Sequence, residues 1–115
     1  MKNIQIEGLI QELKKKAIVE KVNLWKRIAS DLEKPTRNRR IVNLFSINKN
    51  SKDNETILVP GKILATGELN KKVTIAAYTV SKEAKQKIKN SGSSVVSIYE
   101  LMEKNPKGKN VRILG

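Results

Sequence analysis

The residues with the clearest chemical potential form a cationic stretch over residues 34–51, KPTRNRRIVNLFSINKNS. This stretch contains no Asp or Glu, and its cations are Lys34, Arg37, Arg39, Arg40 and Lys49. Guanidinium groups bind phosphate through two parallel hydrogen bonds, and lysines bind it as point charges. Asn43 and Asn48 add amides that can bond to bases, riboses or phosphates. A solvated surface loop would also be polar, but the lack of compensating acids favours an anionic partner.

The whole chain has the same charge imbalance. Its 115 residues include 24 Lys and Arg against 11 Asp and Glu, a formal net charge of +13. Such an excess implies a polyanionic partner, either nucleic acid or an anionic membrane. No apolar run approaches the roughly 20 residues that span a bilayer, no signal-peptide pattern opens the chain, and the best basic run is a loop. Nucleic acid is therefore favoured, and we expect neither a membrane nor a small-molecule substrate as partner.

Residues suited to catalysis or metal binding are scarce. The chain has no Cys and no His, which excludes disulfides, zinc sites built from those ligands and the common nucleophile–histidine pairs. Ser46 and Lys49 match an S-x-x-K spacing, but the companion motifs are missing, so chance is the better explanation. Gly61 and Gly67 are spaced like P-loop glycines without the Lys and Ser or Thr that must follow, and we interpret them as turn residues. We expect no enzymatic activity, no metal and no cofactor.

Two helices are predicted ahead of the cationic stretch. Over residues 3–19 the apolar side chains recur at helical spacing, and they are Ile6, Leu9, Ile10, Leu13 and Ala17. Asn23 can cap a second helix that ends near Glu33. Trp25 lies on its apolar face, so we interpret it as a core anchor, and the four aromatic residues of the chain are too few for a base-stacking platform. The lysines at 14–16 suit phosphate contacts and a solvated last helical turn equally well.

The remaining segments predict an α/β fold. Pro35 ends the second helix, and residues 34–55 are predicted to form an extended basic arm, folded back partly through Val42, Leu44 and Phe45. In the body, strands are predicted over residues 56–59, 62–66, 73–80, 95–96 and 111–114, with a Pro60-Gly61 turn after the first. Helices capped by Ser81 and Ser97 alternate with these strands. The predicted units are thus a helical hairpin (1–33), the arm (34–55) and a compact body of alternating short strands and helices (56–115).

Several motifs in this order resemble one protein family. The run EKPTRNRRIVNLFSIN, residues 33–48, resembles the signature of large-subunit ribosomal protein L-eighteen-e of archaea and eukaryotes. Residues 24–29, LWKRIA, are similar to the family's second helix, and residues 59–64, VPGKIL, to its next hallmark. Residues 67–92 are similar to the core shared with the bacterial counterpart, L-fifteen. The ending over residues 105–113 fits the archaeal form.

The resemblance implies an irregular α/β body with an extended basic arm, bound to large-subunit ribosomal RNA beside neighbouring ribosomal proteins. It also implies a non-enzymatic protein located in the large ribosomal subunit of the cytoplasm. By position, the family's RNA-contacting signature falls on Lys34, Arg37, Arg39, Arg40, Asn43 and Asn48. Further candidate RNA-binding cations are Lys49, Lys52, Lys62, Lys107 and Lys109. The family commonly has a basic residue where Ser46 stands, so we expect one phosphate contact fewer there. A DNA-associated or chromatin protein is the alternative that the charge permits.

Overall fold

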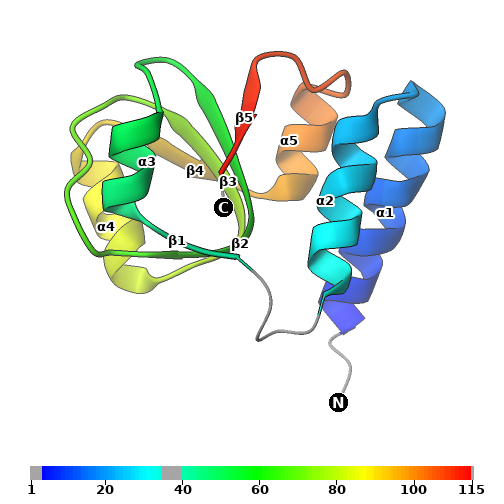
Figure 1. Ribbon diagram of the computed structural model, residues 1–115, viewed down its shortest axis with the longest axis horizontal. Helices are drawn as coiled ribbons and strands as arrows, with labels where there is room; N and C mark the ends of the chain where they lie inside the picture. Colours follow the sequence, from blue (N-terminus) through cyan, green and yellow to red (C-terminus); the bar gives the residue numbers. More distant parts are fainter. Residues whose placement is uncertain (1–3, 35–39, 115) are drawn as a thin grey trace.

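The computed structural model describes residues 4–34 and 40–114, and it shows a parallel sheet between two layers of helices (Figure 1). In chain order the elements are α1 (Ile4–Glu20), α2 (Asn23–Glu33), β1 (Arg40–Asn43), α3 (Leu44–Asn50), β2 (Thr56–Leu64), β3 (Thr74–Val80), α4 (Lys82–Asn90), β4 (Ser94–Val96), α5 (Ile98–Lys104) and β5 (Val111–Ile113). The predicted α/β class, the N-terminal helical hairpin and the later alternation of strands and helices are confirmed. The segment between the hairpin and the body differs from the prediction.

The long strand β2 organises the sheet. All of its pairings are parallel, and β3 runs along one of its edges. The other edge is shared by two short strands: β5 pairs with residues 56–58, and β1 pairs with residues 61–64. The strand β4 continues the sheet beyond β3. The strands β1 and β5 lie far apart in the sequence, but they follow each other along the same edge of β2.

Residues 56–64 form one strand, so the predicted turn at Pro60-Gly61 is wrong. Pro60 has no N–H, but it lies between the part of β2 that pairs with β5 and the part that pairs with β1. The register against β3 also shifts there, between Val59 and Lys62. A bulge is one of the few sheet positions where proline fits, because no ladder hydrogen bond is lost. Gly67, by contrast, is a turn residue with φ of 95°.

The prediction of an extended arm is wrong for residues 40–50, which form β1 and α3. Val42, Leu44 and Ile47 are buried in the core of the body. Each fully buried side chain of this size contributes about 1.5–3 kcal/mol, which offsets part of the entropy cost of ordering the segment. Phe45 was expected to hold the arm against the body, but its side chain is 60% exposed. Arg37 and Arg39, near the start of the predicted arm, lie outside the described residues.

The sheet separates two hydrophobic cores. Leu58 and Ala76 point to the core beneath α1, α2 and α5, whereas Ile57 and Ile75 point to the core beneath α3 and α4. This alternation follows from the period of two in a β-strand. Trp25 is fully buried in the first core, and its Nε1–H donates to the carbonyl of Pro106 at 2.8 Å. The prediction that Trp25 is a core anchor is confirmed.

Local capping signals explain two of the helix starts. The hydroxyl of Ser81 accepts a hydrogen bond from the N–H of Ala84 at 3.2 Å, and that of Ser97 accepts one from the N–H of Glu100 at 3.0 Å. The predicted cap at Asn23 is wrong, because Asn23 is already the first residue of α2 and the preceding residue caps the helix without a side-chain bond. Val22, which takes the cap position, has no polar side-chain atom that could accept such a bond.

Candidate functional site

The sheet places the candidate RNA-binding residues near both ends of its strands. Arg40, described by its backbone alone, begins β1 opposite Gly61, and Lys62 follows in β2. Arg40 and Lys62 therefore lie on adjacent strands. Arg40 and Lys62 form the first group of candidates, at the carboxyl-terminal half of β2. Lys34 follows the end of α2, and its ammonium forms an ion pair with Asp31 at 3.3 Å.

Lys62 is the cation of this first group whose side chain the structure describes as exposed. Its strand partner Ile41 is 68% exposed, while the next pair, Val42 and Ile63, is buried. Because side chains alternate between faces, Ile41 and Lys62 point away from the core that holds Val42. The ammonium of Lys62 is exposed and has no partner in the described part of the chain. It is free to contact an anion without breaking an internal bond.

A second group of predicted cations lies where the strands begin. Lys109 precedes β5 and Lys52 precedes β2, and these two strands are neighbours. Lys107, in the same loop as Lys109, forms an ion pair with Glu20 at 3.0 Å, which ties the loop to the end of α1. Arg40 and Lys62 thus lie in one region of the sheet, and Lys52, Lys107 and Lys109 lie in another.

Two predicted RNA-binding amides are engaged within the protein. The Oδ1 atom of Asn43 accepts a hydrogen bond from the N–H of Ser46 at 2.9 Å and caps α3. The Oδ1 atom of Asn48 accepts one from the N–H of Asn70 at 2.8 Å. Both amide oxygens thus hold α3 in place. One of the two acceptor sites of each oxygen is therefore used within the protein.

Phe45 is a candidate that sequence reasoning missed. Leu44 and Ile47 occupy the inward positions of α3, so Phe45 points outward, and Lys49 follows one turn later on the same side. Lys49 is exposed and has no partner among the described residues. An exposed aromatic ring beside a cation offers a stacking surface for an unpaired base and a contact for its phosphate. The inward spacing of positions 44 and 47 was the signal in the sequence.

A second feature that sequence reasoning missed is a row of lysines on α4. Lys82, Lys85 and Lys89 recur at i, i+3 and i+7, are exposed, and have no partner among the described residues. Lys87 differs, because its ammonium donates to two backbone carbonyls of the loop after β2, both at 3.0 Å. The same helix thus carries lysines that face solvent and one that supports the fold.

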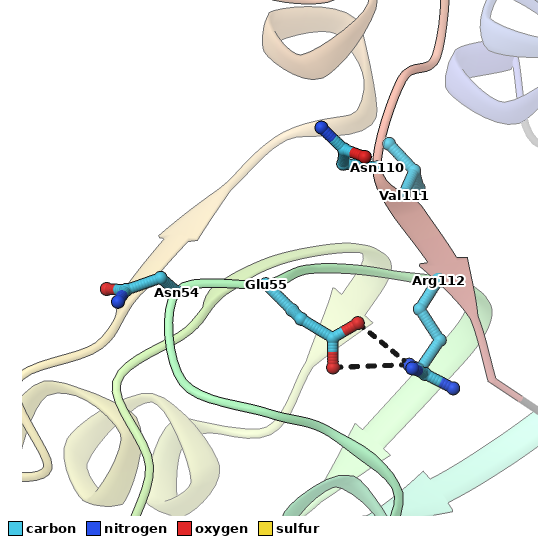
Figure 2. Close-up of a pocket in the computed structure, with 5 residues that line it drawn as sticks. All are labelled: Asn54, Glu55, Asn110, Val111 and Arg112. Atoms are coloured by element: carbon cyan, nitrogen blue, oxygen red, sulfur yellow. Dashed lines mark hydrogen bonds and ion pairs between the residues drawn. The ribbon is translucent and has the colours of Figure 1, made fainter.

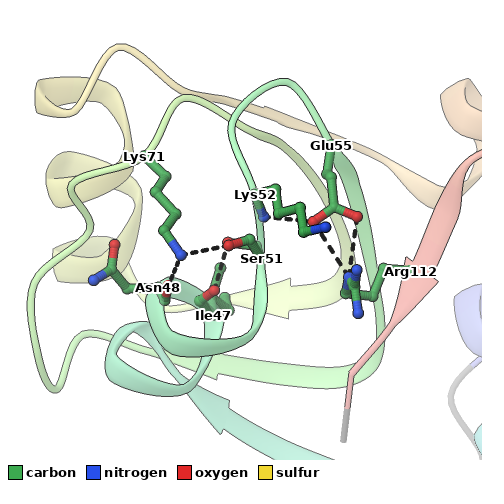
Figure 3. Close-up of polar contacts among 7 residues, drawn as sticks. All are labelled: Ile47, Asn48, Ser51, Lys52, Glu55, Lys71 and Arg112. Atoms are coloured by element: carbon green, nitrogen blue, oxygen red, sulfur yellow. Dashed lines mark hydrogen bonds and ion pairs between the residues drawn. The ribbon is translucent and has the colours of Figure 1, made fainter.

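Lys71 is another cation with a structural role. Its ammonium donates to the carbonyl of Asn48 at 2.5 Å and to the carbonyl of Ser51 (Figure 3). The hydroxyl of Ser51 donates in turn to the carbonyl of Ile47 at 2.6 Å. The last carbonyls of a helix lack partners within the helix, and a cation is favoured there by the helix dipole. Lys71 thus completes the end of α3 and is not available to an external anion.

The ion pair between Glu55 and Arg112 joins β2 to β5. Arg112 Nε lies 3.0 Å from a carboxylate oxygen of Glu55, and the N–H of Lys52 donates to the same carboxylate at 2.5 Å (Figure 3). The bond from the Lys52 N–H, followed by the contacts with Arg112, lowers the pKa of Glu55 below its ordinary value of 4.5. The pair lies in an open hollow of about 610 Å³ (Figure 2), lined by Asn54, Glu55, Asn110, Val111 and Arg112. The charges of Glu55 and Arg112 compensate each other, so we interpret this ion pair as a structural contact between β2 and β5.

Other classes of site receive no support from the described residues. Within the described ranges there is no group of three or more acidic residues placed to hold a metal ion. No helix in those ranges is long and apolar enough to cross a lipid bilayer. The candidate site is therefore a set of exposed cations with an exposed aromatic ring.

Several known proteins similar to this chain carry the same description. A family model for the ribosomal proteins 50S-L15 and 50S-L18e and their 60S counterpart matches residues 6–96. The chain is 44% identical over 112 residues to "Large ribosomal subunit protein eL18" of Sulfurisphaera tokodaii, which covers 97% of this chain and 92% of that protein. The proteins of the same description from Methanothermobacter thermautotrophicus and Pyrobaculum aerophilum are 42% and 40% identical, with coverage of 97% of this chain and 93% and 92% of theirs.

Proposed function

Since this chain belongs to the family of large-subunit ribosomal proteins that includes 50S-L15 and 50S-L18e, we propose that it binds large-subunit ribosomal RNA through its unpaired surface cations. Its role in the large subunit is structural. The partners are ribosomal RNA and neighbouring ribosomal proteins, and the proposal involves no catalytic step.

The surplus of free cations is the observation that carries this proposal. Among the described residues, six carboxylates have a Lys or Arg partner within 4 Å, and they are Glu20, Asp31, Glu33, Glu55, Glu68 and Glu100. The chain has 11 carboxylates for 24 cations. Even if every carboxylate paired with one cation, 13 cations would have no acid of their own. Lys49 and Lys62 are exposed and have no partner among the described residues. Phosphates can neutralise them and release condensed counterions, which drives binding.

The two candidate regions suit recognition of RNA shape more than of base sequence. Lysine ammonium groups contact phosphates, and they reduce the repulsion where two RNA strands approach each other. We assign phosphate contacts to Arg40 and Lys62 of the first group and to Arg37 and Arg39. Phe45 and Lys49 add a place where one unpaired base can stack. The oxygens of Asn43 and Asn48 support α3 beneath this surface.

The test removes three arginines together. We expect the variant Arg37→Ala, Arg39→Ala, Arg40→Ala to keep its circular dichroism and to lose binding to large-subunit ribosomal RNA at moderate salt. The matched control replaces the lysines at 14–16 with Ala, which removes the same charge from α1 and should weaken binding far less. Unchanged affinity of the arginine variant would refute the proposal.

Competition between nucleic acids separates this function from the DNA-binding alternative. Labelled ribosomal RNA bound to the full chain is challenged with unlabelled ribosomal RNA or with duplex DNA of equal phosphate content. We expect the RNA to displace the label at the lower concentration. A DNA-associated protein would give the reverse order.

A further inference from the structure

A groove lies between α1 and α5, two helices that pack on the same side of the sheet. It has a volume of about 290 Å³, and its lining residues are Glu12, Lys15, Lys16, Val19, Tyr99, Met102 and Glu103. In Figure 1, α1 and α5 lie on the opposite side of the sheet from α3 and α4. The groove therefore opens on a different surface from Phe45, Lys49 and the lysines of α4.

Apolar side chains are exposed along this groove and beside it. Val19 is 65% exposed, Tyr99 is 43% exposed, and Ile18, next to Val19, is 77% exposed. Met102 is buried and belongs to the core beneath the helices. Large aliphatic side chains with this exposure mark an interaction surface when they lie together. Contact with a partner would remove their apolar area from water.

The charge of this surface differs from that of the rest of the molecule. The helices α1 and α5 together carry four cations against five carboxylates, which leaves 20 cations against six carboxylates for the rest of the chain. Glu12 and Glu103 line the groove, and neither has a cationic partner within the described ranges. Lys15 and Lys16 also line the groove, so its lining carries no net charge, whereas the rest of the chain is strongly basic. The groove therefore attracts phosphate less than the basic surfaces do, and Glu12 and Glu103 remain open to ion pairs with the cations of a partner.

We propose that the groove between α1 and α5 docks a segment of a neighbouring ribosomal protein that combines apolar side chains with Lys or Arg. The apolar side chains of that segment would cover Val19 and Tyr99. Its cations would pair with Glu12 and Glu103. The inference rests on the proposed function for its setting, the assembled large subunit, but it uses none of the residues assigned to RNA binding. The protein would thus have one surface for RNA and another for protein.

Site-specific photocrosslinking tests which partner covers the groove. The photoreactive residue p-benzoylphenylalanine replaces Tyr99 in the full chain, expressed as the only copy in archaeal cells, and purified large subunits are irradiated. We expect an adduct that resists ribonuclease and is cleaved by protease, with mass spectrometry placing the crosslink on a basic and apolar segment of a ribosomal protein. The same probe at Lys62 should give an adduct that ribonuclease degrades.

Two results would overturn the inference. One is a ribonuclease-sensitive adduct from position 99, and the other is no adduct there under conditions in which position 62 reacts. If the probe at 99 keeps the chain out of subunits, the probe at Val19 provides the same comparison. Failure of the adduct at position 62 alone would count against RNA binding and would leave the groove inference standing.

Charge reversal provides an independent test with a matched control. Glu103→Lys adds two positive charges at the groove, and Glu83→Lys adds the same charge on α4, where Glu83 is also exposed and unpaired among the described residues. We expect Glu103→Lys to reduce incorporation into large subunits at least fivefold without weakening binding to free ribosomal RNA. Glu83→Lys should reduce neither. Equal incorporation of both variants would contradict a cationic protein partner.

Discussion

The division of lysines into free and internally bonded groups leads to a quantitative prediction. Lys49 and Lys62 are exposed and have no partner among the described residues, whereas Lys71 and Lys87 donate to backbone carbonyls. Replacing the first two lysines with Gln removes two phosphate contacts and breaks no internal bond. We therefore expect weaker RNA binding with a free energy of unfolding changed by less than about 0.5 kcal/mol per site.

The salt dependence of binding gives the size of this effect. Each phosphate contact contributes about 0.9 to the slope of log affinity against log salt concentration on duplex nucleic acid, so losing two contacts lowers the slope by about 1.8. If the RNA affinities of the wild type and the variant become equal near 1 M salt, the variant should bind about 60-fold more weakly at about 0.1 M salt. This ratio corresponds to a difference of about 2.4 kcal/mol in binding free energy. As the salt concentration rises from about 50 to about 200 mM, the ratio of the wild-type affinity to the variant affinity should fall about 12-fold.

The assay is a fluorescence titration of large-subunit ribosomal RNA fragments at several salt concentrations, paired with urea unfolding. The matched control is Lys71→Gln with Lys87→Gln, which removes the same charge. In that variant, carbonyls at the end of α3 and after β2 lose their donors. We expect its free energy of unfolding to fall by about 1–3 kcal/mol per site while the salt slope stays the same. The reasoning is refuted if both variants change the slope equally.

Three further predictions concern single positions. Phe45→Ala should weaken binding to RNA with unpaired bases by about 1–3 kcal/mol without changing the salt slope, as titration of the same fragments would show, because stacking carries no net charge. Gly67→Ala should lower the free energy of unfolding in urea by about 1–3 kcal/mol, because φ is 95° and a Cβ there would lie 2.6 Å from the backbone nitrogen of Phe45; an unchanged unfolding midpoint would contradict this. The lowered pKa of Glu55 favours its charged form in the folded state, so its contribution to stability is present above pH 4.5 and is lost as the pH falls below that value. The free energies of unfolding of the wild type and of Glu55→Gln should therefore differ at neutral pH and become equal in acid. A difference that does not change with pH would show that the charge of Glu55 is not its cause.

Local signals in the sequence determined several parts of the fold. The caps at Ser81 and Ser97 use a bond to an N–H three residues later, so neighbouring residues suffice to specify them. The helical spacing of apolar residues in α1 and α2 is likewise local, and it placed Trp25 in the core. The charge excess is a property of composition, and by itself it indicates an anionic partner, whatever the fold.

The tertiary structure alone decided how the cationic stretch is used. Whether residues 40–43 extend into solvent or pair with residues 61–64 depends on a partner strand about 20 residues away, which no local signal specifies. The same pairing let Pro60 lie within β2, at a bulge, instead of in a turn. Once β1 and α3 had packed, Asn43 and Asn48 were bonded inward and Phe45 was left exposed. Composition thus established what kind of partner to expect, but strand pairing and burial determined which residues remain free to contact it.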